Sequence, residues 1–354
     1  MNEHYFMGTK TQDGFKNTFG NEISDKHYFG YILKGGAGTG KSSLMKAVAS
    51  AFEATEDIAL YHCSSDPDSL DAVVLKNSKV YICDGTAPHV MECTYPGVTE
   101  KILNLGEFWN EKLLQAHKQE IMTSTDENAA LHQKATALQN ALSALYSNIF
   151  TQGSLYLLRE KLLAFSKRFV RKHLTKQKDQ QGSVTVRQLS ALTEYGYMTY
   201  TETLDSFDTI YVMKDSLLSA SAELVSSVMQ QALSLGYDVI VSPSPLAHCP
   251  YEHILIPAPG FALISETPLS VLSDLGELIN MNRFYDRDTL KAVSREVKLD
   301  TAMLKDLAET LYDTIAKAKR VHDEIESYYI AAMDFSSVKE LTDELIYEIR
   351  SKQC

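Results

Sequence analysis

The stretch Phe29-Gly-Tyr-Ile-Leu-Lys-Gly-Gly-Ala-Gly-Thr-Gly-Lys-Ser-Ser43 decides the fold that this sequence predicts. Its second half fits the pattern G-x-x-x-x-G-K-[ST]. The apolar residues before the glycines suit a buried strand, and Ser43 to Phe52 carries apolar residues at the spacing of an amphipathic helix. A strand, a glycine-rich loop and a helix in this order predict a P-loop, which binds phosphate. The alternative is a glycine-rich turn that only imitates the motif.

Each residue type in the loop has a physical task. Glycines allow backbone conformations in which several N–H groups point at phosphate oxygens. Lys41 supplies positive charge to the β- and γ-phosphates, and the Ser42 hydroxyl can ligate Mg²⁺. We therefore expect ATP and Mg²⁺ as ligands; the chain has no [NT]-K-x-D motif, which disfavours a signalling GTPase. The predicted nucleotide-binding residues are Gly35, Gly36, Ala37, Gly38, Thr39, Gly40, Lys41, Ser42 and Ser43.

Two further apolar runs, Asp57 to Cys63 and Lys79 to Asp84, predict neighbouring strands. Ligands of a parallel sheet lie beyond the carboxyl ends of its strands, so Asp84 should lie beside the loop and help to hold Mg²⁺. His62 lies at the end of the first of these strands, and His89 lies in the polar segment after the second; both are candidates for orienting water, and each could equally be a structural histidine. The predicted catalytic residues are Lys41, Asp84, His89 and His62, and the predicted metal ligands are Ser42 and Asp84.

The second half of the chain repeats the first. Tyr211-Val-Met-Lys214 matches Tyr31-Ile-Leu-Lys34 at an offset of 180 residues (31 to 211), and the apolar positions stay in register well beyond it. The residues predicted to bind phosphate and metal are not repeated. Ala220, Ser221 and Ala222 stand opposite Gly40, Lys41 and Ser42, and Ser265 stands opposite Asp84. The sequence predicts a second core that keeps the fold and has lost nucleotide binding.

Each core is followed by apolar residues at heptad spacing, from Leu131 to Ile149 and from Leu304 to Tyr328. Beyond them, Ser154-Leu155 matches Ser337-Val338. We expect long helical hairpin arms that pack within the chain or against each other; a protein partner of the arms, or a homo-oligomer, is the alternative. The predicted fold is α/β: a parallel, P-loop NTPase-like sheet duplicated in tandem. The predicted segments are 1–108 (active core), 109–178 (arm and linker), 179–285 (degenerate core) and 286–354 (second arm).

Composition narrows the class of protein. The 354 residues carry a net charge of −12, which argues against a surface made to grip nucleic acid. A basic cluster from Lys167 to Lys178 could contact phosphate locally or simply be a solvated helix end. We expect no signal peptide and no membrane span, since no run approaches eighteen apolar residues. The five scattered cysteines lack CxxC spacing, so we expect a cytoplasmic protein with reduced thiols.

These motifs resemble a family of bacterial cytoplasmic P-loop proteins that are described as predicted ATPases and are built from two related halves. The likeness rests on segments spread over nearly the whole chain: 31–42, 61–71, 84–89, 95–97, 104–109 and 252–257. It implies that Lys41, Ser42 and Asp84 form the nucleotide site, and that the segments around His62 and His89 are functional. Relatives can carry a readable P-loop in the second half, and this chain departs from that.

The expected function is a Mg²⁺-dependent ATPase that couples hydrolysis to movement between a catalytic and a pseudo-catalytic half. The first alternative is a kinase, which needs an acceptor pocket lined by Ser64 to Asp71. The second is a nucleotide-gated switch or scaffold. No glutamate directly follows Asp84, so the catalytic base stays unassigned. No arginine precedes Arg159, so an arginine finger could not come from the first core.

Overall fold

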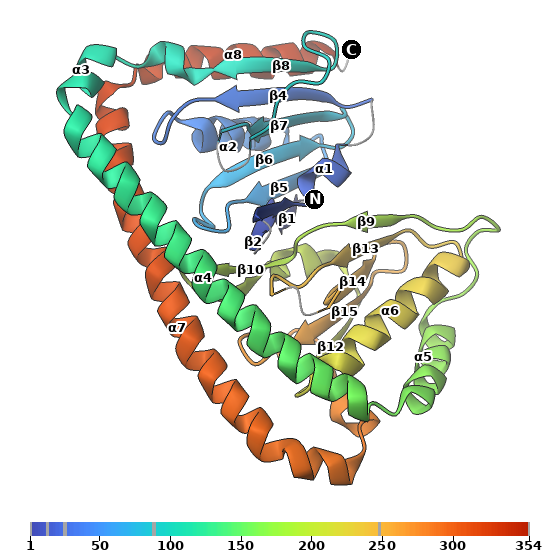
Figure 1. The fold of residues 1–354 in the computed structure, drawn as a ribbon. Helices are drawn as coiled ribbons and strands as arrows, with labels where there is room; N and C mark the ends of the chain where they lie inside the picture. Colours follow the sequence, from blue (N-terminus) through green and yellow to red (C-terminus); the bar gives the residue numbers. More distant parts are fainter. Residues whose placement is uncertain (1, 12–13, 24–26, 87–89, 247–248, 353–354) are drawn as a thin grey trace. The chain divides into compact units, whose positions relative to one another are not determined.

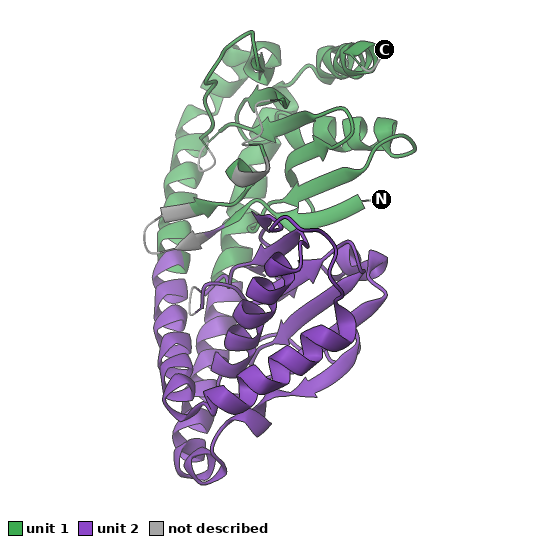
Figure 2. Cartoon of the chain, turned by 90° about the vertical axis from the view of Figure 1, so that its right-hand side faces the viewer, with its two compact units in different colours: residues 1–8, 15–135, 313–354 green, residues 9–14, 136–312 purple. Residues whose placement is uncertain are grey.

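A computed structural model describes residues 2–11, 14–23, 27–86, 90–246 and 249–352. It divides into two compact units (Figure 2). Unit 1 comprises Met1–Gly8, Phe15–Ala135 and Asp313–Cys354, and unit 2 comprises Thr9–Gly14 and Thr136–Tyr312. Each unit contains a six-stranded sheet with helices packed on it, so the predicted α/β class is confirmed.

The sheet of unit 1 has the strand order β1-β5-β6-β7-β4-β8 (Figure 1). Its strands are β1 (Asn2–Phe6), β4 (Phe29–Lys34), β5 (Ile58–His62), β6 (Leu70–Leu75), β7 (Val80–Asp84) and β8 (Glu100–Asn104). The strands predicted at β4, β5 and β7 are confirmed. All neighbours are parallel except that β6 runs antiparallel to both β5 and β7.

The prediction of a wholly parallel sheet is therefore wrong. Only residues 63–69 join β5 to β6, and only residues 76–79 join β6 to β7. A parallel connection needs a crossover of a dozen or more residues, so these short links force β6 to return in the opposite direction.

Helix α2 (Lys41–Phe52) follows β4 after the glycine-rich loop, residues 35–40, as predicted. Its apolar face is buried on the sheet, and the buried side chains are Leu44, Met45, Val48, Ala49 and Phe52. This packing fixes the direction of α2, so that its first turn begins at the carboxyl end of β4.

The sheet of unit 2 has the order β16-β12-β15-β14-β13-β9 and repeats the plan of unit 1. Its strands are β9 (Val184–Val186), β12 (Thr209–Lys214), β13 (Val239–Ser242), β14 (His253–Ile256), β15 (Phe261–Glu266) and β16 (Glu277–Asn280). As with β6, β14 is the one antiparallel strand. The register also agrees: Leu33 pairs with Asp84, and Met213 pairs with Ser265. The predicted alignment of Asp84 with Ser265 is therefore confirmed.

Each unit takes one covering helix from the other half of the sequence. The helices after the cores are α4 (Lys118–Tyr156) and α5 (Arg159–His173), then α7 (Arg287–Ala332) and α8 (Phe335–Lys352). In unit 1, α8 packs on α2 through Val338, Leu345 and Ile349. In unit 2, α5 packs on α6 (Ser219–Ser234), and Phe169 of α5 contacts Tyr211 and Phe261. The units therefore cut across the four predicted segments.

The true correspondence of the helices also differs from the predicted one. Backbone bridges join Trp109 to Met333 and Leu157 to Tyr285. Trp109 and Tyr285 are 176 residues apart in the sequence, and so are Leu157 and Met333 (109 to 285 and 157 to 333). The two bridges are therefore equivalent at an offset of 176 residues. At that offset Leu162 of α5 matches Val338 of α8, and both are buried. The predicted match of Leu155 with Val338 is wrong, because Leu155 lies on α4 and is 72% exposed.

Shorter elements complete the chain. They are β2 (Gly8–Thr11), β3 (Gly14–Asn17), α1 (Phe19–Glu22), α3 (Glu111–Ala116), the hairpin of β10 (Ser190–Thr193) and β11 (Gly196–Thr199), and 3₁₀ turns at Leu105–Phe108, Thr201–Ser206 and Met281–Phe284. Among the described residues, no helix combines the length and the apolar character that crossing a membrane requires.

Candidate functional site

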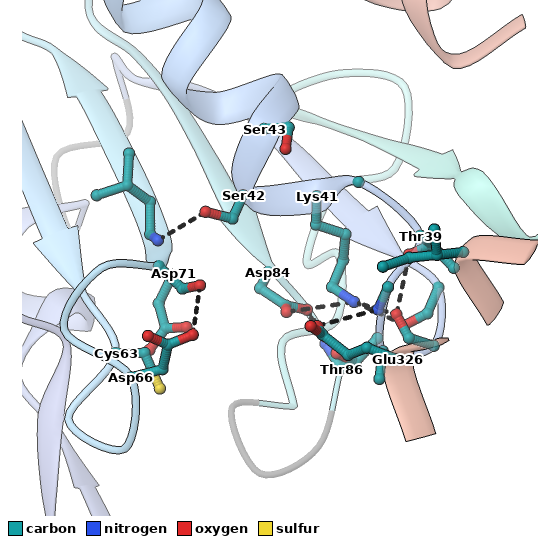
Figure 3. Close-up of a pocket in the computed structure, with 18 of the residues that line it drawn as sticks. Thr39, Lys41, Ser42, Ser43, Cys63, Asp66, Asp71, Asp84, Thr86 and Glu326 are labelled. Atoms are coloured by element: carbon teal, nitrogen blue, oxygen red, sulfur yellow. Dashed lines mark hydrogen bonds and ion pairs between the residues drawn. The ribbon is translucent and has the colours of Figure 1, made fainter. Parts of the chain in front are cut away.

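A pocket of about 590 Å³ surrounds the glycine-rich loop and the first turn of α2 in unit 1. All nine residues predicted to bind nucleotide line it, together with Asp84 at the end of β7 (Figure 3). The strand-end argument thus placed Asp84 correctly. His62 is not among the lining residues, and His89 lies outside the described residues.

The backbone of the loop explains its glycines. Gly38 has φ of 67° and Gly40 has φ of 90°, in the left-handed region that side chains rarely adopt. Gly40 is the N-cap of α2, so the reversal at this residue turns the chain into the helix. The loop is further held by Thr39, which is buried and donates its hydroxyl proton to the Gly36 carbonyl at 2.9 Å. The result is a curved backbone at the positive end of α2.

Lys41 and Asp84 are brought together inside the pocket. The Lys41 Nζ lies 3.6 Å from Asp84 Oδ2, and both side chains are largely buried. Lys41 also donates to the carbonyls of Gly35 and Gly36, at 3.0 and 2.7 Å. Asp84 is oriented by Thr86, whose backbone N–H and hydroxyl donate to Asp84 Oδ1 at 2.8 and 2.6 Å. The Lys41 ammonium group therefore bonds to acceptors of the protein itself.

Ser42 lines the same pocket, and its Oγ accepts a hydrogen bond from the backbone N–H of Leu70 at 3.0 Å. Within the part of the chain that the structure describes, no three or more His, Cys, Asp or Glu side chains are grouped so that they could hold a metal ion. Protein carboxylates alone therefore do not make a metal site here. Ser42 and Asp84 fit a Mg²⁺ ion only if phosphate oxygens and water supply its other ligands.

The pocket also contains residues outside the predicted site list. Asp66, Ser69, Leu70 and Asp71 belong to the predicted acceptor segment, Ser64 to Asp71, and Cys63 and Thr86 lie in segments that the resemblance marks as functional. The sequence singled out none of Lys46, His322, Glu326, Ile330 and Phe335. Asp66 accepts from the Ser69 hydroxyl at 2.8 Å and lies 3.6 Å from Lys319 of α7. Burial raises the pKa of the Cys63 thiol far above its usual value, so this cysteine is no nucleophile at neutral pH.

Glu326 reaches the loop from α7. The backbone N–H of Gly38 donates to Glu326 Oε1 at 3.2 Å, and His322 Nε2 lies 3.4 Å from the same oxygen. The hydrogen bond from His322 lowers the pKa of Glu326, outweighing the opposite effect of burial. Glu326 is therefore a carboxylate at neutral pH. Gly38 and Glu326 are 288 residues apart, so no local pattern could have joined them.

His62 is engaged elsewhere in unit 1. Its Nε2 lies 3.0 Å from Nδ1 of His4, and its Nδ1 lies 2.8 Å from the Pro67 carbonyl. Burial lowers the pKa of His62 to about 4, so the ring is neutral at pH 7. The structure does not bring His62 to the glycine-rich loop.

The corresponding loop of unit 2 is filled by its own side chains. The Asp215 carboxylate, only 4% exposed, accepts from the backbone N–H groups of Leu217 and Ser221 at 3.0 and 2.8 Å. The Tyr285 hydroxyl donates to Asp215 at 2.8 Å and accepts from the Ala220 N–H at 2.8 Å. Burial raises the pKa of Asp215 against the opposing effect of these hydrogen bonds. The start of α6 thus satisfies its N–H groups internally.

Comparisons with protein-family models, with curated proteins and with solved structures found no match to this chain. The likeness to a bacterial ATPase family stays a prediction from the motifs. The case for a function therefore rests on the sequence of the loop and on the geometry of its pocket.

Proposed function

We propose that residues 35–42 form a P-loop and that the protein binds ATP with Mg²⁺ and hydrolyses it. The observation that carries this proposal is the meeting of Lys41 and Asp84, 3.6 Å apart, in a pocket lined by the whole motif. The pocket volume, about 590 Å³, is in the usual range for small-molecule sites.

The chain's own residues would divide the work as follows. Loop N–H groups and the start of α2 bind phosphate oxygens. Lys41 exchanges the carbonyls of Gly35 and Gly36 for the β- and γ-phosphates. Ser42 and Asp84 hold Mg²⁺, which when bound neutralises charge that develops on the phosphates. Thr86 keeps Asp84 in place for this role.

The proposal includes coupling of hydrolysis to movement between a catalytic and a pseudo-catalytic half. Two features support it. Asp215 and Tyr285 fill the second loop, which leaves one loop for nucleotide. Helix α7 belongs to unit 2 up to Tyr312 and to unit 1 from Asp313, and its unit 1 part contacts the P-loop through Glu326. One continuous helix thus carries residues of both units.

A second function, transfer of the γ-phosphate to an acceptor, is favoured by one specific observation. The pocket extends from the P-loop to the link between β5 and β6 and to the start of β6, where Asp66 and Ser69 of the link and Asp71 of β6 line it. A kinase needs such an acceptor region, with a carboxylate to take the proton of an attacking hydroxyl. The two functions differ in whether turnover requires an added acceptor.

The deciding experiment measures phosphate release from ATP·Mg²⁺ by the pure protein, with ATP binding followed in parallel. Lys41→Ala is the test variant, and Lys339→Ala, which removes an exposed lysine of α8, is the control. Release by wild type and control, lost in Lys41→Ala, supports an ATPase. Tight binding without release supports the kinase or the nucleotide-gated switch, and a screen of hydroxyl acceptors separates these two. Wild-type protein that binds no ATP refutes both.

A further inference from the structure

Helix α7 closes over the P-loop closely enough to compete with a ligand. A Cβ added to Gly38 would lie 2.7 Å from the backbone carbonyl oxygen of Glu326, and one added to Gly36 would lie 3.1 Å from the ring of Tyr329. The two glycines therefore leave just enough room for α7. Its side chains Glu326 and His322 line the pocket in which the phosphates would lie.

Glu326 makes a contact that a phosphate would make. In a P-loop the backbone N–H groups are the donors that cradle phosphate oxygens. The Gly38 N–H donates to Glu326 Oε1 instead, at 3.2 Å, and Lys41 is turned to the carbonyls of Gly35 and Gly36 (Figure 3). The Glu326 carboxylate and a phosphate of the nucleotide cannot both accept from the Gly38 N–H, because both are anions and each needs this same donor.

We propose that Glu326 is an internal competitor of the nucleotide: its carboxylate takes the place of a phosphate on the P-loop, and ATP binds only by displacing it. The inference rests on the proposed function of this site. Glu326 is held by few contacts: its side chain is 34% exposed, and among the described residues it is hydrogen-bonded to Gly38 and His322 and attracted by the charge of Lys319. It can therefore leave without disrupting a core. Anything that draws α7 away from the loop would raise the affinity for ATP.

The test compares dissociation constants of a non-hydrolysable ATP analogue with Mg²⁺, measured by titration calorimetry. Glu326→Gln keeps the shape of the side chain and removes its charge, and Glu326→Ala removes the competing group. Glu324→Gln is the matched control, because it makes the same change at an exposed site two residues away on α7. We expect both Glu326 variants to bind about tenfold more tightly than wild type, as a coupling of this kind typically gives. The control should bind as wild type does.

The outcomes separate the two proposals. Equal or weaker binding by both Glu326 variants, with wild-type binding that is lost in Lys41→Ala, overturns the competition and leaves the nucleotide site standing. If neither wild type nor the Glu326 variants bind the analogue, the proposed function fails and the competition fails with it. Circular dichroism of each variant establishes that the fold is kept.

Discussion

Replacing Asp215 by alanine should selectively destabilise unit 2. The carboxylate accepts from three buried donors: the N–H groups of Leu217 and Ser221 and the hydroxyl of Tyr285, at 3.0, 2.8 and 2.8 Å. Alanine leaves all three without this acceptor, in a place where the native side chain is 4% exposed. Because Asp215 is the acceptor that occupies the loop of unit 2, the loss of stability should be large.

The magnitude follows from the contacts. A buried donor left without an acceptor costs roughly 1–3 kcal/mol, so three of them set an upper range of about 3–9 kcal/mol. Removing a buried carboxylate returns part of this, since burial already raises the pKa of Asp215, and water can enter the space. We expect a net loss of about 3–5 kcal/mol, as for other broken buried networks. Asp215→Asn keeps one oxygen and should lose less.

Urea unfolding followed by two signals can locate the loss. The single tryptophan, Trp109, belongs to unit 1 and reports on that unit alone. Far-ultraviolet circular dichroism reports on both units, and a two-unit chain need not unfold in one step. In Asp215→Ala the dichroism should show an early transition while the Trp109 midpoint stays near the wild-type value. A dichroism curve that superimposes on that of wild type would refute the argument that Asp215 holds the loop.

Four more substitutions test other parts of the structure. Leu345→Ala in α8 should destabilise unit 1 by about 2–4 kcal/mol, and its counterpart Phe169→Ala in α5 should destabilise unit 2 by about 3–5 kcal/mol, both measured by the same urea curves. Glu252→Gln should remove a contribution to the stability of unit 2 that falls as the pH rises. Burial raises the pKa of Glu252 from 4.5 to about 7, so the contribution of this carboxyl group falls by about 3 kcal/mol across that interval in the wild type. Gly30→Ala should cost about 1–3 kcal/mol, because its Cβ would lie 2.1 Å from the Tyr81 ring, and Tyr81→Leu should restore part of the loss when combined with it.

Three of these predictions can be contradicted as follows. Tyr347→Ala, at a side chain of α8 that is 76% exposed, should leave the Trp109 midpoint unchanged. A Leu345→Ala protein whose Trp109 midpoint equals that of wild type would contradict the packing of α8 on unit 1. His253, next to Glu252, has its pKa lowered to about 3 by burial in the folded chain and titrates near 6.5 when unfolded, so its contribution to stability rises with pH and opposes the fall from Glu252. Glu252→Gln leaves that rise in place and must therefore change the slope. An unchanged slope would contradict the raised pKa. If Gly30→Ala were as stable as wild type, Tyr81 would have to pack differently.

The sequence predicted those parts of the fold that local patterns determine. The strand, glycine-rich loop and helix from Phe29 to Phe52 follow from a motif and two apolar runs, and the duplication follows from matched apolar positions. Strand β6 and its direction were not predicted, because only the apolar runs at 57–63 and 79–84 were considered as further strands. The shortness of residues 63–69 already excludes a crossover. The exchange of α5 and α8 could not be predicted, because both helices lie beyond the predicted heptad stripes, and an apolar helix face does not show which core it covers.

The residues of the candidate site also fall into those that a local pattern predicts and those that it cannot predict. Asp84 was predictable, since a strand end next to β4 must lie near the loop. His62 also ends a strand, yet its ring is hydrogen-bonded to His4 of β1. That pairing depends on a strand order that no local pattern reveals. Glu326 lies on a helix whose polar face looks like any solvated face in the sequence. It became a candidate only when α7 was placed over Gly38.

The two halves of the molecule differ in how firmly a carboxylate occupies the loop. Asp215 is part of its loop, is buried, and accepts from three donors at 2.8–3.0 Å. Glu326 comes from a separate helix, is one-third exposed, and accepts from one loop donor at 3.2 Å. Hydrogen bonds to a charged group contribute roughly 1.5–3 kcal/mol each, so a phosphate arriving from water can replace one such bond far more readily than three. A carboxylate occupies the loop in both halves. The number of hydrogen-bond donors and the depth of burial would then explain why phosphate can displace Glu326 in one half and cannot displace Asp215 in the other.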